Sequence, residues 1–301
     1  MSNHPRSLPG LAFVTLLTIA LMMGANHVAA RLAFDNGVSV STAVLFRSGM
    51  TALVVLAILR FSGASLAVPS HQRRPLLMVG VLVAVQSLCL YAAVARLPVA
   101  LALLAFNAYP LWTALWARIL YGEKPEPRVL RAMPLILLGL ALALDVSGAA
   151  SGLGAASHWG RIGAGVLFAT LAAATFGCAL VLTQHGTGGL DGRLRTASTM
   201  GIVALVALAV VLGQGGPSLP QAPVGWWGLA GLTVLYGTAF TVMFTVLPKL
   251  GVVGNSAIMN VEPIFALVLA WAVLGQSIAP AQVVGGLIVV GTVMWLAFRR
   301  R

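Results

Sequence analysis

Two short stretches, Asn107-Ala-Tyr-Pro110 and Asn260-Val-Glu-Pro263, decide how this chain folds. Each lies about halfway along an apolar run long enough to cross a bilayer, 98–120 and 252–274. An Asn followed three residues later by a Pro is unusual in such a run, so its recurrence indicates an internal duplication. Each half thus presents a polar group and a helix-breaking Pro at the depth where membrane carriers bind their substrates.

A constant offset of 153 residues, the spacing from Asn107 to Asn260, brings further residues into register. Arg96 falls on Lys249, and Gly24 in the first apolar run falls on Gly177. The identical pairs include Leu97/Leu250, Val99/Val252, Pro110/Pro263, Ala117/Ala270, Gly122/Gly275 and Pro127/Pro280. The duplication therefore extends over most of the chain.

The composition is that of an integral membrane protein. Hydrophobic residues make up 59% of the chain and charged residues 8%, whereas about a quarter of the residues of a soluble domain are charged. The formal net charge of +12 comes from basic residues at the ends of apolar runs, which sets topology and does not indicate nucleic acid. Cys89 and Cys178 both lie inside apolar runs, which gives no reason to expect a disulfide or metal framework.

Ten apolar runs recur, each close to the roughly 20 residues that cross about 30 Å of hydrocarbon. The sequence therefore predicts an all-α integral membrane fold with ten transmembrane helices in two five-helix repeats, 1–147 and 162–301, joined by an outside connector, 148–161. The first run also has features of a cleaved signal peptide, but the Gly24/Gly177 match assigns it to the duplicated core. The predicted helices are 11–31, 40–60, 75–95, 98–120, 129–147, 162–183, 197–213, 225–247, 252–274 and 280–298.

The loops predict the orientation of the chain. Most of the 18 Lys and Arg residues fall in segments that share one side with both termini, which places both termini in the cytoplasm. The repeat offset spans five helices, an odd number, so the second half enters the membrane in the opposite direction to the first. Two inverted halves around a shared central cavity are the arrangement that many secondary transporters use for alternating access.

These residues resemble the drug/metabolite transporter superfamily, EamA type, over essentially the whole chain. The resemblance implies ten helices in two inverted repeats and a bacterial inner-membrane exporter, similar to exporters of amino acids, aromatic amino acids and methyl viologen. Gln276 stands where many members, and Glu123 in the first half, have Glu, so no role is carried over to that position. The residues that carry the resemblance are Met23-Gly24-Ala25-Asn26, Phe46-Arg47, Tyr91-Ala92-Ala93, Arg96-Leu97-Pro98, the Pro110 to Gly122-Glu123 spacing and Glu262-Pro263 to Gly275.

Two ionisable residues inside predicted helices are candidates for function, because charge at membrane depth is costly. Glu262 lies near the midplane. It could be a counter-ion for a substrate ammonium, a proton-exchanging carboxylate, or a protonated or hydrogen-bonded packing residue. Arg47 lies in the outer half of the second helix. It could attract a substrate carboxylate, or it could snorkel to the surface or pair with Asp35 or a backbone carbonyl. His27, near the outer end of the first helix, is expected at the interface.

Helix periodicity separates the candidate lining residues into faces. Tyr109 and Glu262 occupy the same repeat position, and we expect their side, rather than that of Asn107 and Asn260, to face the cavity. An aromatic wall with an acid suits an amphipathic zwitterion or an organic cation. Pro110 and Pro263 should kink their helices. Further candidates for lining the cavity are Asn26, Gln86, Tyr91 and Tyr236.

The sequence has no phosphate-binding loop, nucleophile elbow or metal-ligand spacing, so we predict a carrier with no enzymatic activity, cofactor or metal. Its predicted function is export of small amphipathic metabolites, foremost neutral or aromatic amino acids. A proton antiporter of drugs or organic cations is the first alternative, and a channel or structural membrane protein the second. The expected partners are a small-molecule substrate and the lipid bilayer; one chain could hold a complete cavity, and Gly/Ala-rich faces also permit a dimer.

Overall fold

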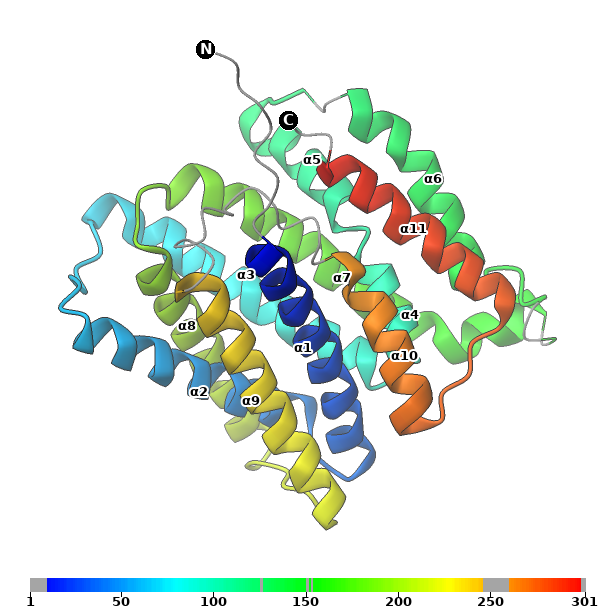
Figure 1. Cartoon of the computed structure of the whole chain (residues 1–301), viewed down its shortest axis with the longest axis horizontal. Coiled ribbons are helices and arrows are strands. Elements are labelled where there is room, and N and C mark those ends of the chain that lie inside the picture. The colour runs from blue at the N-terminus through cyan, green and yellow to red at the C-terminus, as the bar shows by residue number, and fades with distance from the viewer. Residues whose placement is uncertain (1–9, 125–126, 150–151, 153, 246–259, 299–301) are drawn as a thin grey trace.

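The computed structural model describes residues 10–124, 127–149, 152, 154–245 and 260–298, and these residues form helices and connecting loops without any strand. The predicted all-helical class is confirmed for this part of the chain (Figure 1). The helices are α1 Gly10–Asp35, α2 Val40–Phe61, α3 Ser70–Val94, α4 Val99–Phe106, α5 Tyr109–Tyr121, α6 Pro127–Ala143, α7 Ala155–Gly186, α8 Gly192–Gly213, α9 Pro223–Thr245, α10 Glu262–Leu274 and α11 Pro280–Phe298.

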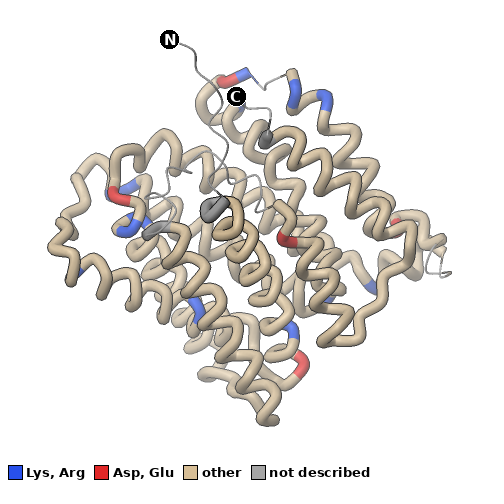
Figure 2. The backbone as a smooth tube through the Cα atoms, viewed as in Figure 1, with Lys and Arg blue, Asp and Glu red and all other residues tan. Residues whose placement is uncertain are grey.

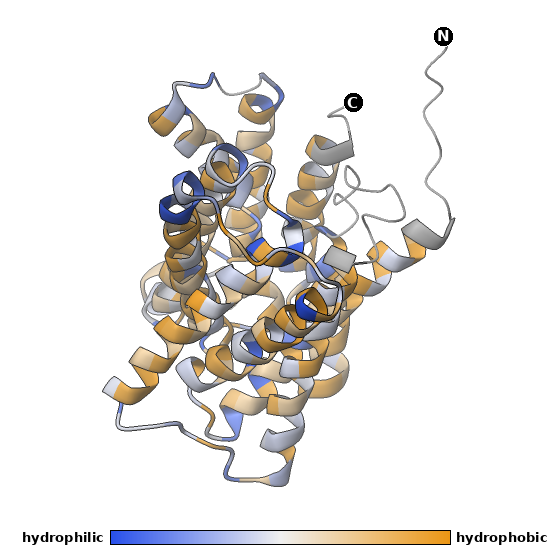
Figure 3. Ribbon diagram, turned by 90° about the vertical axis from the view of Figure 1, so that its left-hand side faces the viewer, coloured by the Kyte–Doolittle hydropathy of each residue, from blue (hydrophilic) through white to orange (hydrophobic). Residues whose placement is uncertain are grey.

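The bundle has the surface of a membrane protein. Within the described residues, seven helical stretches are long and apolar enough to cross a bilayer, one of them being α4 and α5 taken together, and α10 and α11 are shorter apolar helices. Large apolar side chains face outward, with Trp227 77% and Trp271 66% exposed, which only lipid makes favourable over so many residues. Charged residues are few and most lie near helix ends, whereas hydrophobic residues dominate the helices (Figures 2 and 3).

The fourth predicted span is broken at Asn107. Helix α4 ends at Phe106 and α5 begins at Tyr109 with Pro110 in its first turn. Helix α10 likewise begins at Glu262 with Pro263 in its first turn. The prolines therefore start new helices and do not kink continuous ones, because a missing N–H costs nothing in a first turn. Residues 252–259 of the predicted ninth span lie outside the described residues.

The two halves carry helices with the same bounds at the repeat spacing. Adding 153 to the bounds of α5, Tyr109–Tyr121, gives those of α10, Glu262–Leu274. Both helices end at a glycine in the left-handed region, Gly122 with φ 69° and Gly275 with φ 64°, where a side chain would be strained. The C-terminal ends of α5 and α10 are thus fixed by the same local chemistry.

Helices of one half pack against helices of the other. The most extensive contacts join α1 to α9, α3 to α7, α2 to α8 and α6 to α11, and Figure 1 shows α6 and α11 side by side at one edge of the bundle. At the repeat spacing α1 corresponds to α7 and α3 to α9, so the first two pairs exchange into one another. In Figure 1, α1 runs from the centre of the view toward the bottom, whereas α7 starts at the lower right and ends at the upper left.

Two glycines bring this packing close around the broken helices. A Cβ at Gly24 of α1 would lie 3.0 Å from the backbone nitrogen of Ala266 in α10. A Cβ at Gly177 of α7 would lie 2.7 Å from the backbone nitrogen of Thr113 in α5. These four residues are two repeat pairs, so both halves use a bare glycine where a long helix crosses a broken one.

The connector between the halves is shorter than the sequence indicates. Helix α7 begins at Ala155, seven residues before its predicted start at 162. Polar residues that resemble a loop, such as His158, are instead helical and anchor the end of the preceding helix. The His158 ring Nε2 lies 2.9 Å from the carbonyl oxygen of Leu144, and Trp159 Nε1 donates to the carbonyl of Val146 at 3.1 Å.

Candidate functional site

Tyr91 of α3 is the centre of a buried polar cluster. Its side chain is fully buried, and its hydroxyl donates to Oδ1 of Asn26 in α1 at 2.9 Å. The rings of His27 and Phe34, also in α1, meet the Tyr91 ring edge-on with centroids 5.6 and 5.7 Å away. A buried tyrosine needs a partner for its hydroxyl, and Asn26 supplies it. Tyr91 thereby ties α3 to α1 in the interior of the bundle.

Glu262 reaches this cluster from the start of α10. Its Oε1 lies 3.2 Å from Nε2 of His27, and the two side chains are 21% and 3% exposed, respectively. Glu262 is in the first helical turn, where free backbone N–H groups favour a negative charge. The expectation that His27 lies at the interface is therefore wrong. Helix α1 continues two turns beyond His27 to Asp35, which places the imidazole inside the bundle.

Arg47 of α2 lies on the other side of Tyr91. Its guanidinium carbon is 4.5 Å from the centroid of the Tyr91 ring and 3.9 Å from that of the Tyr236 ring, distances typical of cation–π contacts. Nη2 donates to Ser87 Oγ at 2.8 Å, and this hydroxyl donates to Gln86 Oε1 at 3.3 Å. Arg47 is 3% exposed, so it does not snorkel.

The expected alternative of an Arg47–Asp35 pair is also absent. Asp35 instead accepts two bonds from Arg31 Nε, at 2.8 and 3.0 Å. Three buried nitrogens of the cluster, Asn26 Nδ2, His27 Nδ1 and Arg47 Nε, have no hydrogen-bond partner among the described residues. Buried polar atoms without partners are rare in native proteins, so the cluster has unused capacity for hydrogen bonding.

A second cluster, which is aromatic, surrounds Tyr109, the residue at the repeat position of Glu262. The rings of Phe106, Tyr109 and Phe176 lie with centroids 5.2 to 5.7 Å apart, joining α4, α5 and α7. The Tyr109 hydroxyl faces Asn260 Oδ1 at 3.5 Å. Tyr109 and Asn260 were expected on opposite faces, but Asn260 lies in a short 3₁₀ turn before α10 and is turned toward Tyr109. Asn260 and Glu262 thus link the two clusters.

The structure sorts the predicted site residues into three groups. Asn107 is a local cap, since its Nδ2 donates to the carbonyl of Leu103 at 3.1 Å. Tyr109 and Asn260 belong to the aromatic cluster. The residues that meet around Tyr91 are Asn26, Arg47, Gln86, Tyr236 and Glu262.

The sequence did not single out His27, Ser87 or Phe176 as site residues. A signal for His27 was present, because it follows Gly24 by three residues and so shares the helix face that meets α10. Nothing in the described residues groups three or more His, Cys, Asp or Glu side chains as a metal site.

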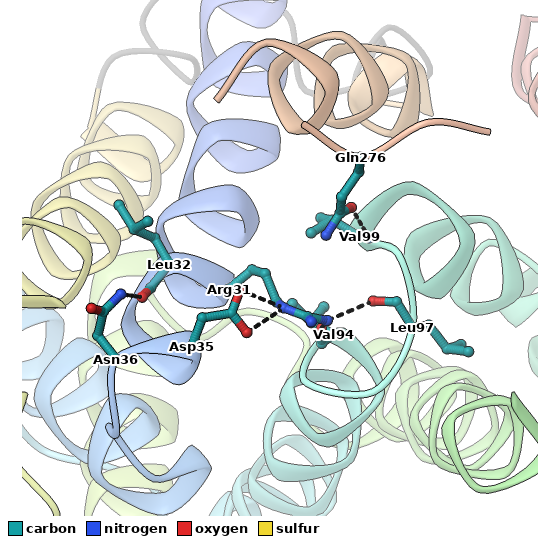
Figure 4. A network of polar contacts seen from close by, with 8 residues as sticks. All are labelled: Arg31, Leu32, Asp35, Asn36, Val94, Leu97, Val99 and Gln276. Atoms are coloured by element: carbon teal, nitrogen blue, oxygen red, sulfur yellow. Dashed lines mark hydrogen bonds and ion pairs between the residues drawn. The ribbon is translucent and has the colours of Figure 1, made fainter. Parts of the chain in front are cut away.

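A polar network joins several helices at one end of the bundle (Figure 4). Arg31 Nη1 donates to the carbonyl oxygens of Val94 and Leu97 at 3.1 and 3.2 Å, which ties the end of α1 to the α3–α4 connection. Gln276, just after α10, accepts a bond from the Val99 amide at 3.0 Å. Gln276, to which no role was assigned from the sequence, therefore joins the α10–α11 connection to the start of α4.

A pocket of about 410 Å³ lies elsewhere, between the α2–α3 and α7–α8 loops, where Gln72 and Asp191 line it. It is open to solvent, and Gln72 is the one buried side chain among its polar lining residues, so we do not take it for the functional site. The cluster itself is a closed set of buried side chains, and the central cavity remains a prediction.

The fold and this buried cluster define a multi-pass helical membrane protein with a polar centre. The sequence profile of the EamA-like transporter family matches the chain twice, over residues 10–144 and 163–298. The chain belongs to this family, whose members are membrane transporters of the drug/metabolite transporter superfamily.

Comparison with solved structures agrees at the level of the fold. A structure titled "Crystal structure of protein" is 20% identical, with a TM-score of 0.59 over 96% of this chain and 98% of that one. No curated protein matches the sequence.

Proposed function

We propose that the protein is a secondary transporter that exports small amphipathic metabolites, foremost neutral or aromatic amino acids, across the bacterial inner membrane. The carrying observation is the polar cluster around Tyr91, buried in an apolar bundle at the point where α10 begins. Charged and polar side chains are costly at this depth, and Glu262 and Arg47 contribute opposite charges to the same cluster. A small molecule with both polar and apolar parts suits such surroundings.

Each part of the cluster has a role in this proposal. Glu262 attracts the substrate ammonium, and His27, which contacts its carboxylate, holds that group in place. Tyr91 and Tyr236 offer aromatic surface for the apolar part of the substrate. The aromatic cluster around Tyr109 extends that surface beyond Asn260.

Alternating access is the mechanism that the packing supports. Helices of one half pair with helices of the other in an exchangeable pattern, α1 with α9 and α3 with α7. If both termini are cytoplasmic, the Arg31 network near the C-terminal end of α1 lies on the outer side, and this conformation is closed toward the outside. Outward opening then requires Arg31 to leave the carbonyls of Val94 and Leu97. The terminal segments, 1–9 and 299–301, lie outside the described residues.

A proton antiporter of organic cations is the second candidate, and the His27–Glu262 contact favours it. The Glu262 carboxylate lies 3.2 Å from the His27 imidazole. In an antiporter this carboxylate would release a proton when an organic cation binds, because the proton and the organic cation compete for its negative charge. In this case Glu262 binds either proton or substrate, and transport depends on the pH gradient.

Counterflow in liposomes tests both candidates. Purified protein is reconstituted into vesicles loaded with one unlabelled compound, and uptake of the labelled compound is followed with and without a pH gradient. Saturable counterflow of aromatic amino acids supports the exporter. Cation uptake that requires a vesicle interior more acidic than the outside supports the antiporter. Current that rises with voltage without saturating would instead indicate a channel.

A further inference from the structure

Arg47 is a buried charge without a counter-ion. It is 3% exposed, and no Asp or Glu oxygen among the described residues lies within 4.0 Å of its guanidinium nitrogens. Glu262, the acid of the same cluster, faces His27 instead. A buried, uncompensated charge is strongly unfavourable. Arg47 Nη2 is satisfied by Ser87, whereas Nε has no partner among the described residues.

The unused donors of the cluster gather around Tyr91. Arg47 Nε and Asn26 Nδ2 both lack partners among the residues that the structure describes. Arg47 lies against the Tyr91 ring, while Asn26 holds its hydroxyl. Both unpartnered groups are N–H donors, and the unpartnered His27 Nδ1 lies in the same cluster. A ligand that completes these bonds must bring acceptor atoms and, opposite Arg47, negative charge.

Packing of α2 gives no reason for a charge at this position. The residue of the second half that is equivalent to Arg47 at the 153-residue offset is Met200. Met200 is buried and its sulfur accepts from the Tyr236 hydroxyl at 3.7 Å. The second half therefore fills the same place with an apolar side chain of similar length. Arg47 is thus an addition to the scaffold.

We propose that Arg47 and Asn26 form a carboxylate-binding subsite, so that the transported compound carries a carboxylate in addition to the group that Glu262 attracts. This proposal rests on the proposed function and narrows it. The planar guanidinium takes one or both carboxylate oxygens, the Asn26 amide adds a donor, and the tyrosine rings hold the fork in place. The substrate is then a zwitterion or an organic acid, and a simple amine lacks half of the contacts.

Binding to purified full-length protein in detergent tests the subsite without requiring transport. The probes share one phenyl ring: L-phenylalanine, 3-phenylpropionate, which lacks the ammonium, and 2-phenylethylamine, which lacks the carboxylate. The readout is the shift of the thermal unfolding midpoint with ligand concentration, which yields an apparent affinity. We expect both carboxylates to bind wild type, and Arg47→Met to weaken their binding at least about tenfold, the usual loss for one charged hydrogen bond.

The amine and the unliganded protein separate the subsite from a purely structural role. In Arg47→Met, binding of 2-phenylethylamine should be unchanged, and the midpoint without ligand should be equal or higher, because the variant removes an uncompensated buried charge. Arg47→Lys should restore part of the carboxylate binding. The proposal is overturned if neither carboxylate binds wild type, if all three probes weaken together, or if carboxylate binding survives in Arg47→Met.

Arg96 provides the matched control. Its guanidinium carbon lies 4.8 Å from the Phe168 ring centroid and its Nη1 donates to the Ala92 carbonyl, but it is exposed. Arg96→Met should leave the affinity for both carboxylates at the wild-type value. If the carboxylates bind as expected but show no saturable counterflow in liposomes, the subsite stands and the exporter function fails.

Discussion

The Tyr91 cluster, which includes Glu262, and the aromatic cluster around Tyr109 share one backbone arrangement and differ in chemistry. Both begin where a helix starts at a repeat position, with Pro in the first turn, a bare glycine on the crossing helix and a left-handed glycine at the end. The first half places Tyr109 among phenylalanines, while the second half places Glu262 beside His27. The duplicated scaffold therefore fixes where the groups lie, and single side chains decide whether a place carries charge.

The largest effect should come from the charge itself. Glu262→Gln keeps the shape of the side chain and removes its charge, so the apparent affinity for 2-phenylethylamine should fall about a hundredfold, which corresponds to about 3 kcal/mol for a lost charged hydrogen bond. The shift of the thermal unfolding midpoint with the concentration of 2-phenylethylamine measures this change.

The corresponding change in the other half should be small. Tyr109→Phe removes a hydroxyl that faces Asn260 at 3.5 Å, a distance at the limit for a hydrogen bond, and should change the same affinity less than about threefold. Equal losses in the two variants would contradict the division of roles between the clusters.

The glycine crossings should give the next largest effect, on stability. Gly177→Ala places a Cβ 2.7 Å from a backbone nitrogen of α5, and Gly24→Ala one at 3.0 Å from a backbone nitrogen of α10. Backbone cannot move aside as a side chain can, so each variant should lose about 1–3 kcal/mol, with Gly177→Ala the worse. Thermal unfolding in detergent provides the comparison.

Gly201, whose added Cβ would meet nothing within 4 Å, is the control position for these substitutions. Gly201→Ala should not destabilise the protein. A Gly24→Ala protein as stable as wild type would show that α10 can move away from α1.

These crossings show what a repeat pattern can predict. The offset was visible because Asn, Pro and Gly are rare enough in apolar runs for coincidences to stand out, and such residues mark breaks and helix ends. The position of the break was less accessible. Pro110 alone predicts a kink, whereas the chain gives up helical bonding before it, at Asn107, so that Pro110 falls in a first turn. Whether a Pro kinks a helix or starts a new one depends on tertiary packing, which the local sequence pattern does not reveal.

Tyrosine hydroxyls sharpen the comparison at a smaller scale. Tyr91→Phe leaves the buried Asn26 Oδ1 without its 2.9 Å donor, which should cost about 1–3 kcal/mol of unfolding free energy. Tyr109→Phe loses a much longer contact and should cost less than about 1 kcal/mol. Thermal unfolding midpoints of the two variants in the same detergent give this ranking. A larger loss of stability in Tyr109→Phe than in Tyr91→Phe would argue against Tyr91 as the centre of the site.

The site was predictable in part, and for identifiable reasons. Glu262 and Tyr91 stand out because charge and hydroxyls are rare inside apolar helices. Arg47 was equally visible, but its role was not, because depth in a helix does not say whether a long side chain reaches the surface or turns inward. The partners Ser87 and Phe176 are ordinary residues, and their importance comes from which helices cross, as α2 does with α3 and α5 with α7.

The smallest expected effect concerns the caps of two corresponding helices, α2 and α8. Ser39 caps α2 with a hydroxyl that accepts from the Thr42 amide, whereas Asp191 caps α8 with a carboxylate that accepts from the Arg193 amide. Hydrogen bonds from the Arg193 side chain lower the pKa of Asp191 below its ordinary value of 3.8. A lowered pKa in the folded state means that this contribution to stability is complete above that value and is lost as the pH falls through the folded-state pKa.

Asp191→Asn should therefore lower the thermal midpoint slightly at pH 7. The difference from wild type should shrink as the pH falls below the ordinary value of 3.8 and vanish below the lowered folded-state pKa. The effect is small because Asp191 is 38% exposed and its ion pair with Arg193 is screened by solvent. Ser39→Ala should lower the free energy of unfolding by about 1 kcal/mol both at pH 7 and at acid pH, because a hydroxyl cap does not titrate. Midpoints of the two variants and wild type from pH 7 down to about pH 2 separate these cases. A difference for Asp191→Asn that stays constant over this range would mean that the α8 cap depends on hydrogen-bond geometry and not on charge, as the α2 cap does.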